Sequence, residues 1–223
     1  MRRYIVAGFL LICCAQSAVA QRRPRAVRYG EPGFWFSAGA GLVNGPGVND
    51  GRTASTWDFG NAMNMQYRAS LERTVGSGSS FGVAGTYARI PFVYTSSPIT
   101  LPSGTTGTQC ARCDAHLDMS TLVAVFRAGT GVGFHQVIEL SGGVVAYRNL
   151  KEDAGSAKLA PGGGNVDPIF AIGYGLGYGF SNRTQINFVP DYALAIHERS
   201  GLPNGVSNTN STRSLRLSLR VGL

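Results

Sequence analysis

Residues 170–180 read FAIGYGLGYGF, and the pattern of this segment indicates the fold class. Its large apolar residues alternate strictly with small ones, from Phe170 through Ala171 to Gly179 and Phe180. A two-residue period is that of a β-strand, because successive side chains point to opposite faces. A phosphate-binding loop would also need a lysine and a following helix, and this glycine-rich segment has neither. The stretch is therefore predicted to be a strand.

The last ten residues, SLRLSLRVGL at 214–223, repeat this alternation. One face carries Leu215, Leu217, Leu219, Val221 and Leu223, and the other carries Arg216, Ser218, Arg220 and Gly222. Comparable runs predict eight strands, at 33–43, 57–73, 81–94, 115–128, 134–149, 167–180, 185–198 and 212–223. The third run loses its parity near Arg89 and Pro91, which predicts a bulge or the rim of a barrel. No longer window shows a helical period, so the chain is predicted to be all-β.

The connections between these runs alternate in length. Short connections are predicted at 74–80, 129–133 and 181–184, and long ones at 44–56, 95–114, 150–166 and 199–211. This order is typical of an up-and-down transmembrane β-barrel, and each run is long enough to cross a bilayer. Both termini are then periplasmic, and the long polar loops lie outside the cell. We expect those loops to be mobile and to carry any recognition.

Volume indicates which face of each strand points outward. Side chains already fill the interior of an eight-stranded barrel, so the large apolar rows cannot all point inward. A soluble barrel of the lipocalin type would be overfilled and would leave a stripe of glycines facing water. We therefore expect small and polar residues inside and apolar residues against lipid. Aromatic girdles are predicted from residues near strand ends, namely Phe34, Trp57, Phe81, Tyr94, Phe180 and Tyr192.

The first twenty residues have the pattern of a signal peptide. Arg2 and Arg3 precede a short apolar run at 4–14, and Ala18-Val19-Ala20 is a cleavage site. A twin-arginine signal at Arg2-Arg3 and a lipid-modified Cys13 or Cys14 are alternatives. The chain divides into a signal peptide at 1–20, a basic leader at 21–32 and a barrel at 33–223.

The whole chain carries a formal net charge of +8, and much of it lies in this leader. The leader's arginines are Arg22, Arg23, Arg25 and Arg28. They are interpreted as a solvated segment, with contact to anionic lipid as the alternative. No interleaving of basic and aromatic residues indicates a nucleic-acid partner.

Residues 33–223 resemble the small outer-membrane β-barrels of the OmpA transmembrane-domain and OmpX type. The resemblance rests on the eight amphipathic runs, the loop order, the opening FWFSAGAG at 34–41 and the alternating last run. It implies outer-membrane lipid and lipopolysaccharide as surroundings. It also implies that the barrel-insertion machinery reads the last strand through Leu215, Leu217, Leu219, Val221 and Leu223. The last residue is leucine rather than the usual aromatic residue.

Cys110 and Cys113 are the only cysteines after the signal peptide. In an oxidising compartment they are predicted to form a disulfide in the second long loop. Free thiols are an alternative, as is a metal site with Asp114 and His116. No cofactor is predicted.

Charged residues on the predicted inward faces favour a closed lumen. They are Arg68, Glu72, Asp118, Glu139, Asp191, Arg216 and Arg220, three positive and four negative. Near balance predicts mutual pairing, whereas a selective channel shows an excess of one sign. The predicted function is a structural or surface-interaction role through long extracellular loops. A small-solute pore is the alternative.

A lipid A-modifying enzyme is a further alternative, because His197, Glu198 and Ser200 lie close together in the sequence. In a strand, however, His197 and Glu198 face opposite ways, and the spacing does not match that of the outer-membrane deacylases. The sequence therefore predicts no enzymatic activity, and His197 is interpreted as a lumen or rim residue.

Overall fold

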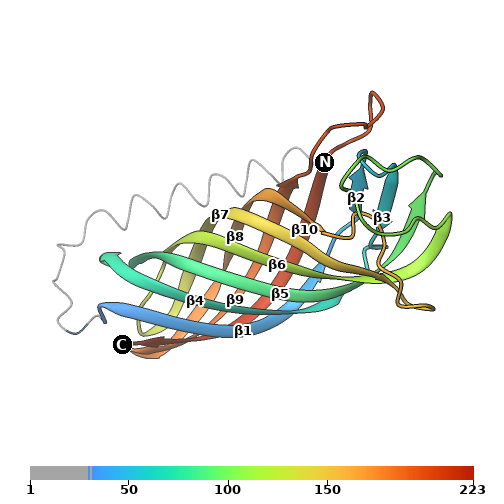
Figure 1. Ribbon diagram of the computed structural model, residues 1–223. Coiled ribbons are helices and arrows are strands. Elements are labelled where there is room, and N and C mark those ends of the chain that lie inside the picture. Colours follow the sequence, from blue (N-terminus) through green and yellow to red (C-terminus); the bar gives the residue numbers. More distant parts are fainter. Residues whose placement is uncertain (1–29, 31) are drawn as a thin grey trace, which may run out of the picture.

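A computed structural model describes Gly30 and residues 32–223, so the predicted signal peptide and nearly all of the basic leader lie outside the described residues. The described chain forms ten strands (Figure 1). They are β1 (Phe34–Asn44), β2 (Gly47–Asp50), β3 (Ser55–Asp58), β4 (Asn64–Gly76), β5 (Ser79–Ser96), β6 (Arg112–Ala128), β7 (Gly133–Glu152), β8 (Asn165–Ser181), β9 (Thr184–Ile196) and β10 (Thr209–Gly222). In this part of the chain no helix has the length and hydrophobicity needed to cross a membrane.

Eight of these strands close into an antiparallel barrel, which confirms the predicted fold class. β1 and β4–β10 each pair with their neighbours around the sheet, and β1 pairs with β10 to close it. The closing register places Trp35 opposite Gly222 and Gly41 opposite Arg216. The backbone N–H of Leu223 also donates to the carbonyl of Phe34, so the two ends of the barrel meet. Closure bonds the edges that an open sheet would expose.

The glycine stripe of β8 lies inside the barrel, and the large residues of the same strand lie outside. Phe170, Tyr174 and Leu176 are 60%, 45% and 56% exposed on the outer face. A Cβ atom added at Gly175 would collide with the backbone carbonyl of Phe188 on β9. The stripe therefore lets β8 and β9 approach closely. The outer face forms the apolar belt that the alternation predicted.

The predicted strand at 57–73 is wrong at its start. Gly60 and Asn61 both have positive φ, 61° and 53°, and they end the extended chain there. Before this turn, β2 and β3 form a hairpin, and β3 pairs with β5 beyond the barrel. Pro91 lies between Ala88, the last β5 residue paired with β4, and Val93, the first paired with β3. Pro91 therefore lies at the barrel rim. The sequence had predicted either a bulge or the rim at this position.

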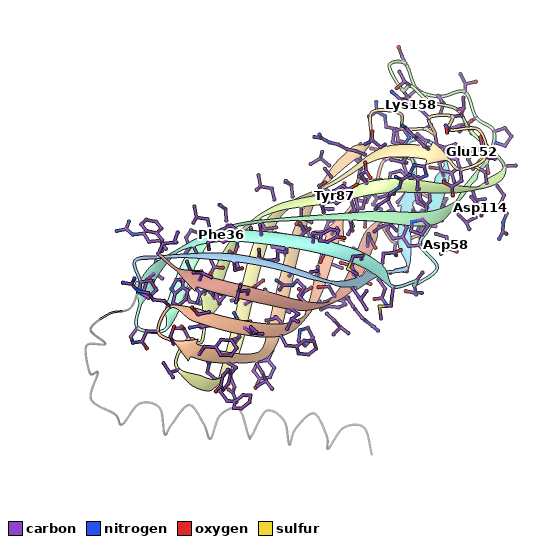
Figure 2. The ribbon with its side chains drawn as sticks, turned by 90° about the horizontal axis from the view of Figure 1, so that it is seen from below. Phe36, Asp58, Tyr87, Asp114, Glu152 and Lys158 are labelled. Atoms are coloured by element: carbon purple, nitrogen blue, oxygen red, sulfur yellow. A yellow bond between two sulfur atoms is a disulfide. The ribbon has the colours of Figure 1, made fainter. Side chains whose placement is uncertain are left out.

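Three of the long connections fold onto one another at the end opposite Leu223 (Figure 1). The N–H of Thr108 donates to the carbonyl of Lys158 at 2.8 Å, and the N–H of Ala160 donates to the carbonyl of Thr108 at 2.9 Å. Gln109 Nε2 donates to the carbonyl of Thr53 at 2.9 Å. Figure 2 shows Asp114, Glu152 and Lys158 gathered at this end and Phe36 near the other. Backbone hydrogen bonds therefore join the loops to one another, and their mobility stays a prediction.

The interior has two layers of different chemistry. Near the short turns it is polar and charged, as expected, but near the long loops it is apolar. The buried cluster there includes Trp57, Tyr94, Leu117, Tyr147, Leu150 and Leu159. Trp57 and Tyr94 are fully buried, so their predicted place in an aromatic girdle is wrong, whereas Phe34, Phe81, Phe180 and Tyr192 are exposed. The reason is that β5–β7 extend past the barrel, and the hairpin and loops cover their inner faces.

Candidate functional site

The charged layer of the lumen is centred on Glu139 of β7. Its Oε1 accepts hydrogen bonds from Arg68 Nη2 at 2.6 Å and from Arg216 Nη2 at 2.8 Å. Its Oε2 lies 2.9 Å from Arg127 Nη2. Arg216 also donates through Nε to Asp191 at 2.8 Å. One carboxylate, 3% exposed, therefore holds three guanidinium groups from three strands.

A second carboxylate, Glu72 of β4, completes the network. Arg220 Nη2 donates to its Oε2 at 2.9 Å, and Arg127 Nη2 lies 3.3 Å from its Oε1. The hydroxyls of Ser70 and Ser80 donate to the same carboxylate at 2.7 and 2.6 Å. Arg127 therefore links the two carboxylates into one network across the lumen.

The structure brings six of the seven predicted lumen charges into this network, and Asp118 is the exception. Asp118 lies on the outer face of β6, where it accepts hydrogen bonds from Tyr87 Oη at 2.9 Å and from Asn149 Nδ2 at 2.6 Å. The assumption that the polar face of every strand points inward was wrong for β6. Its inner face is apolar because it also lines the covered layer near the loops.

Sequence reasoning missed Arg127 for the same reason. It lies on the face of β6 that also carries Leu117, Met119 and Val125, a face taken to be outward. The sequence did offer one signal for Arg127: it is a single arginine on an otherwise apolar face, near the end of the strand that leads into a short turn. With Arg127 included and Asp118 removed, the network of the described residues has four positive groups and three negative ones.

A separate charged cluster lies at the rim near the long loops. His197, just beyond β9, places Nδ1 2.8 Å from Asp167 Oδ2 and Nε2 3.6 Å from Asp50 Oδ1. All three residues are buried. Thr53 donates to Asp50 at 2.7 Å, and the ring of Trp57 meets His197 edge-on with centroids 5.8 Å apart. The cluster therefore ties the β2–β3 hairpin to β8 and β9.

The two carboxylates control the ionisation of this histidine. Burial alone lowers the pKa of His197, but hydrogen bonds and charge from Asp167 and Asp50 outweigh burial and raise that pKa to about 9. The pKa of Asp50 is shifted down, because the partners His197 and Thr53 outweigh the upward effect of burial. The cluster is thus held as ion pairs at neutral pH.

We expect the hairpin to loosen in alkaline solution. A histidine whose folded pKa is raised contributes stability that is complete below its unfolded pKa of 6.5 and is lost as pH rises through about 9. Amide hydrogen exchange in the β2–β3 hairpin, corrected for the intrinsic pH effect, should therefore lose protection across this interval. His197→Gln should remove the dependence, and His135→Gln on the inner face of β7 is the control. Equal protection in the parent on both sides of the interval would contradict the assignment.

The other sequence-predicted residues are placed as follows. Glu198 and Ser200 are exposed while His197 is buried, so the structure does not bring this set together. Cys110 and Cys113 form a disulfide. His116 contacts Asp153 rather than the cysteines, and no group of three or more metal-ligating side chains occurs in the described part of the chain.

The residues predicted as the insertion signal lie on β10 and at the chain end. Leu215, Leu217, Leu219 and Leu223 are exposed on the outer face, and Val221 is half-buried. The inner face of the same strand delivers Arg216 and Arg220 to the lumen network. One strand thus presents both an apolar outer row and a charged inner row.

No protein-family model and no curated protein matches the chain. Solved structures do resemble it. Neisserial surface protein A matches with a TM-score of 0.53 and 14% identity, over 87% of this chain and 99% of that one. Ail of Yersinia pestis matches with a TM-score of 0.44 and 12% identity, over 86% and 99%. The N-terminal barrel domain of Pseudomonas aeruginosa OprF matches with a TM-score of 0.42 and 15% identity, over 85% and 98%.

The likeness to Neisserial surface protein A covers nearly the whole of both chains. It agrees with the strand order, in which β1 pairs with β10 and closes the sheet. The chain therefore has the fold of the small eight-stranded outer-membrane β-barrels.

Proposed function

We propose that this protein is an outer-membrane barrel with a non-conducting lumen and a structural or surface-interaction role. The observation that carries the proposal is the filling of the interior by two successive layers. The network around Glu139 and Glu72 crosses the lumen, and the apolar cluster around Trp57 covers it on the loop side. The cavity between them measures about 40 Å³. That volume holds roughly three water molecules, which is too little for a continuous aqueous path.

The membrane placement rests on the asymmetry of the two ends. The outer face between them is an apolar belt, which a membrane would cover. Short turns lie at the end that carries Leu223, and the folded loops lie at the other (Figure 1). The termini are then periplasmic, and the joined loops are the surface offered to an extracellular partner. Their hydrogen bonds favour a preformed surface, which binds without a large ordering cost.

Conductance in a planar bilayer tests the closed lumen. The parent protein should give no steady single-channel current, because no described water-filled path crosses the two layers. A porin of known conductance and detergent alone are the controls. A large and stable current would contradict the proposal and make a small-solute pore the leading function.

Protease treatment of intact cells tests the orientation. Trypsin should cut after Arg199, which is exposed in the connection between β9 and β10. Arg183, exposed in the short turn between β8 and β9, should stay intact until the outer membrane is opened. Cutting at Arg183 in intact cells, with Arg199 protected, would reverse the orientation.

A further inference from the structure

The lumen network carries one more positive charge than negative. Arg68, Arg127, Arg216 and Arg220 face Glu72, Glu139 and Asp191, and all seven contact one another in pairs. The rim cluster does not balance this charge locally. His197 follows Asp191 by six residues along the chain. At about 3.3 Å per residue of a strand, the two residues are about 20 Å apart. Ala193 and Ala195 occupy the inner face between them.

A buried charge without a partner is costly, because the lumen side chains have replaced the water that would solvate it. Three arginines of the network, Arg68, Arg127 and Arg220, have a buried Nε without a hydrogen-bond partner, and Arg68 is the one of the three that also lines the 40 Å³ cavity. It shares Glu139 Oε1 with Arg216, while its own Nε is buried and has no hydrogen-bond acceptor. Its side chain is only 9% exposed.

Arg68 is one of the residues that line the 40 Å³ cavity. Arg68, Gln66, Ser141 and Ser214 contribute to its polar lining, and Val43 and Ile169 contribute to its apolar lining. The hydroxyl of Ser214 is also buried and has no partner. Asp191 lines the cavity too, but its Oδ2 is bound by Arg216 Nε at 2.8 Å. Two residues with an unpaired buried donor, Arg68 and Ser214, therefore line the same small cavity within a layer that carries an excess positive charge.

We propose that this cavity is a binding site for one monovalent anion of halide size, held by Arg68 Nε and the Ser214 hydroxyl. The anion neutralises the network and satisfies both donors at once. Water would satisfy the donors and leave the charge. A halide ion is comparable in size to the few water molecules that the space admits. The site goes beyond the closed-lumen role, and it would exist whether or not the loops bind a partner.

Halide-dependent stability tests the site. The full barrel in detergent micelles should unfold at a higher temperature in sodium chloride or bromide than in sodium gluconate at equal ionic strength, since gluconate is too large to enter. Binding of the native state raises the midpoint by mass action, and we expect a rise of about 3 °C or more. Ser214→Ala should lose most of this rise. Ser218→Ala, four residues further along the same inner face and outside the cavity lining, should keep it.

Arg68→Gln tests the charge itself, because it removes the excess without changing a carboxylate. It should also abolish the halide dependence; if it does not fold, Ser214→Ala carries the test. A bromide-soaked crystal should show an anomalous peak in the cavity of the parent and none in Ser214→Ala. Equal midpoints in chloride and gluconate, or a cavity that holds only water in bromide, would overturn the proposal.

Discussion

Replacing Glu139 by alanine is expected to lower the free energy of unfolding by roughly 3–5 kcal/mol, the cost of leaving buried charge without its partner. Glu139 contacts Arg68, Arg127 and Arg216. Its removal would leave Arg68 without a carboxylate partner, while Arg127 would keep only Glu72 and Arg216 only Asp191. The network would then hold four positive groups against two negative ones. No other single substitution in the lumen separates as many ion pairs.

Urea unfolding followed by tryptophan fluorescence measures this loss, since Trp35 lies 4.1 Å from the guanidinium of Arg220 in the same layer. Glu139→Gln separates charge from shape: it fills the space but removes the negative charge, so it should be nearly as destabilising as alanine. Glu198→Ala, at an exposed position near the rim, is the control and should stay within about 0.5 kcal/mol of the parent. A Glu139→Ala variant as stable as the parent would contradict the claim that the ion pairs of Glu139 stabilise the barrel.

Trp57→Ala is the second substitution with a large expected effect, a loss of about 3–5 kcal/mol for removing a fully buried aromatic side chain. Trp57 is completely buried and meets the ring of Tyr147 edge-on with centroids 5.9 Å apart. Its Nε1 donates to Ser55 at 3.0 Å. Because the hairpin lies beyond the barrel, we expect the damage to be concentrated in the loop layer.

Limited proteolysis distinguishes local from global loss. In Trp57→Ala, trypsin should cut after Arg52, which is exposed between β2 and β3, while the gel mobility difference between unheated and heated barrel persists. Met63→Ala removes a large side chain that is 57% exposed in the connection between β3 and β4, and it is the matched control. If Trp57→Ala left Arg52 as resistant as in the parent, the hairpin would not depend on this contact.

The strands of the barrel could be predicted from the amino-acid sequence. The alternation at 170–180 and 214–223, with its repeats, gave the strands of the closed sheet, because a strand's period is visible in every pair of neighbouring residues. The same alternation predicted most of the charged residues in the lumen, because Arg216 and Arg220 lie on the face opposite a row of apolar residues. The start of β4 was misplaced because the break at Gly60 and Asn61 interrupts an alternation that looks continuous.

Which face of a strand is covered where the strand extends beyond the barrel could be seen only in the folded protein. Alternation separates two faces but does not name the one that points inward, and the loop layer makes the apolar face of β6 the inner one. Trp57, Tyr94 and Arg127 were misread or missed for that reason, and Asp118 was wrongly placed inside. The rim cluster joins Asp50 to Asp167 and His197, which both lie more than a hundred positions further along the sequence. The local periodicity of the sequence does not predict such contacts, because they form only when the hairpin folds over the end of the barrel.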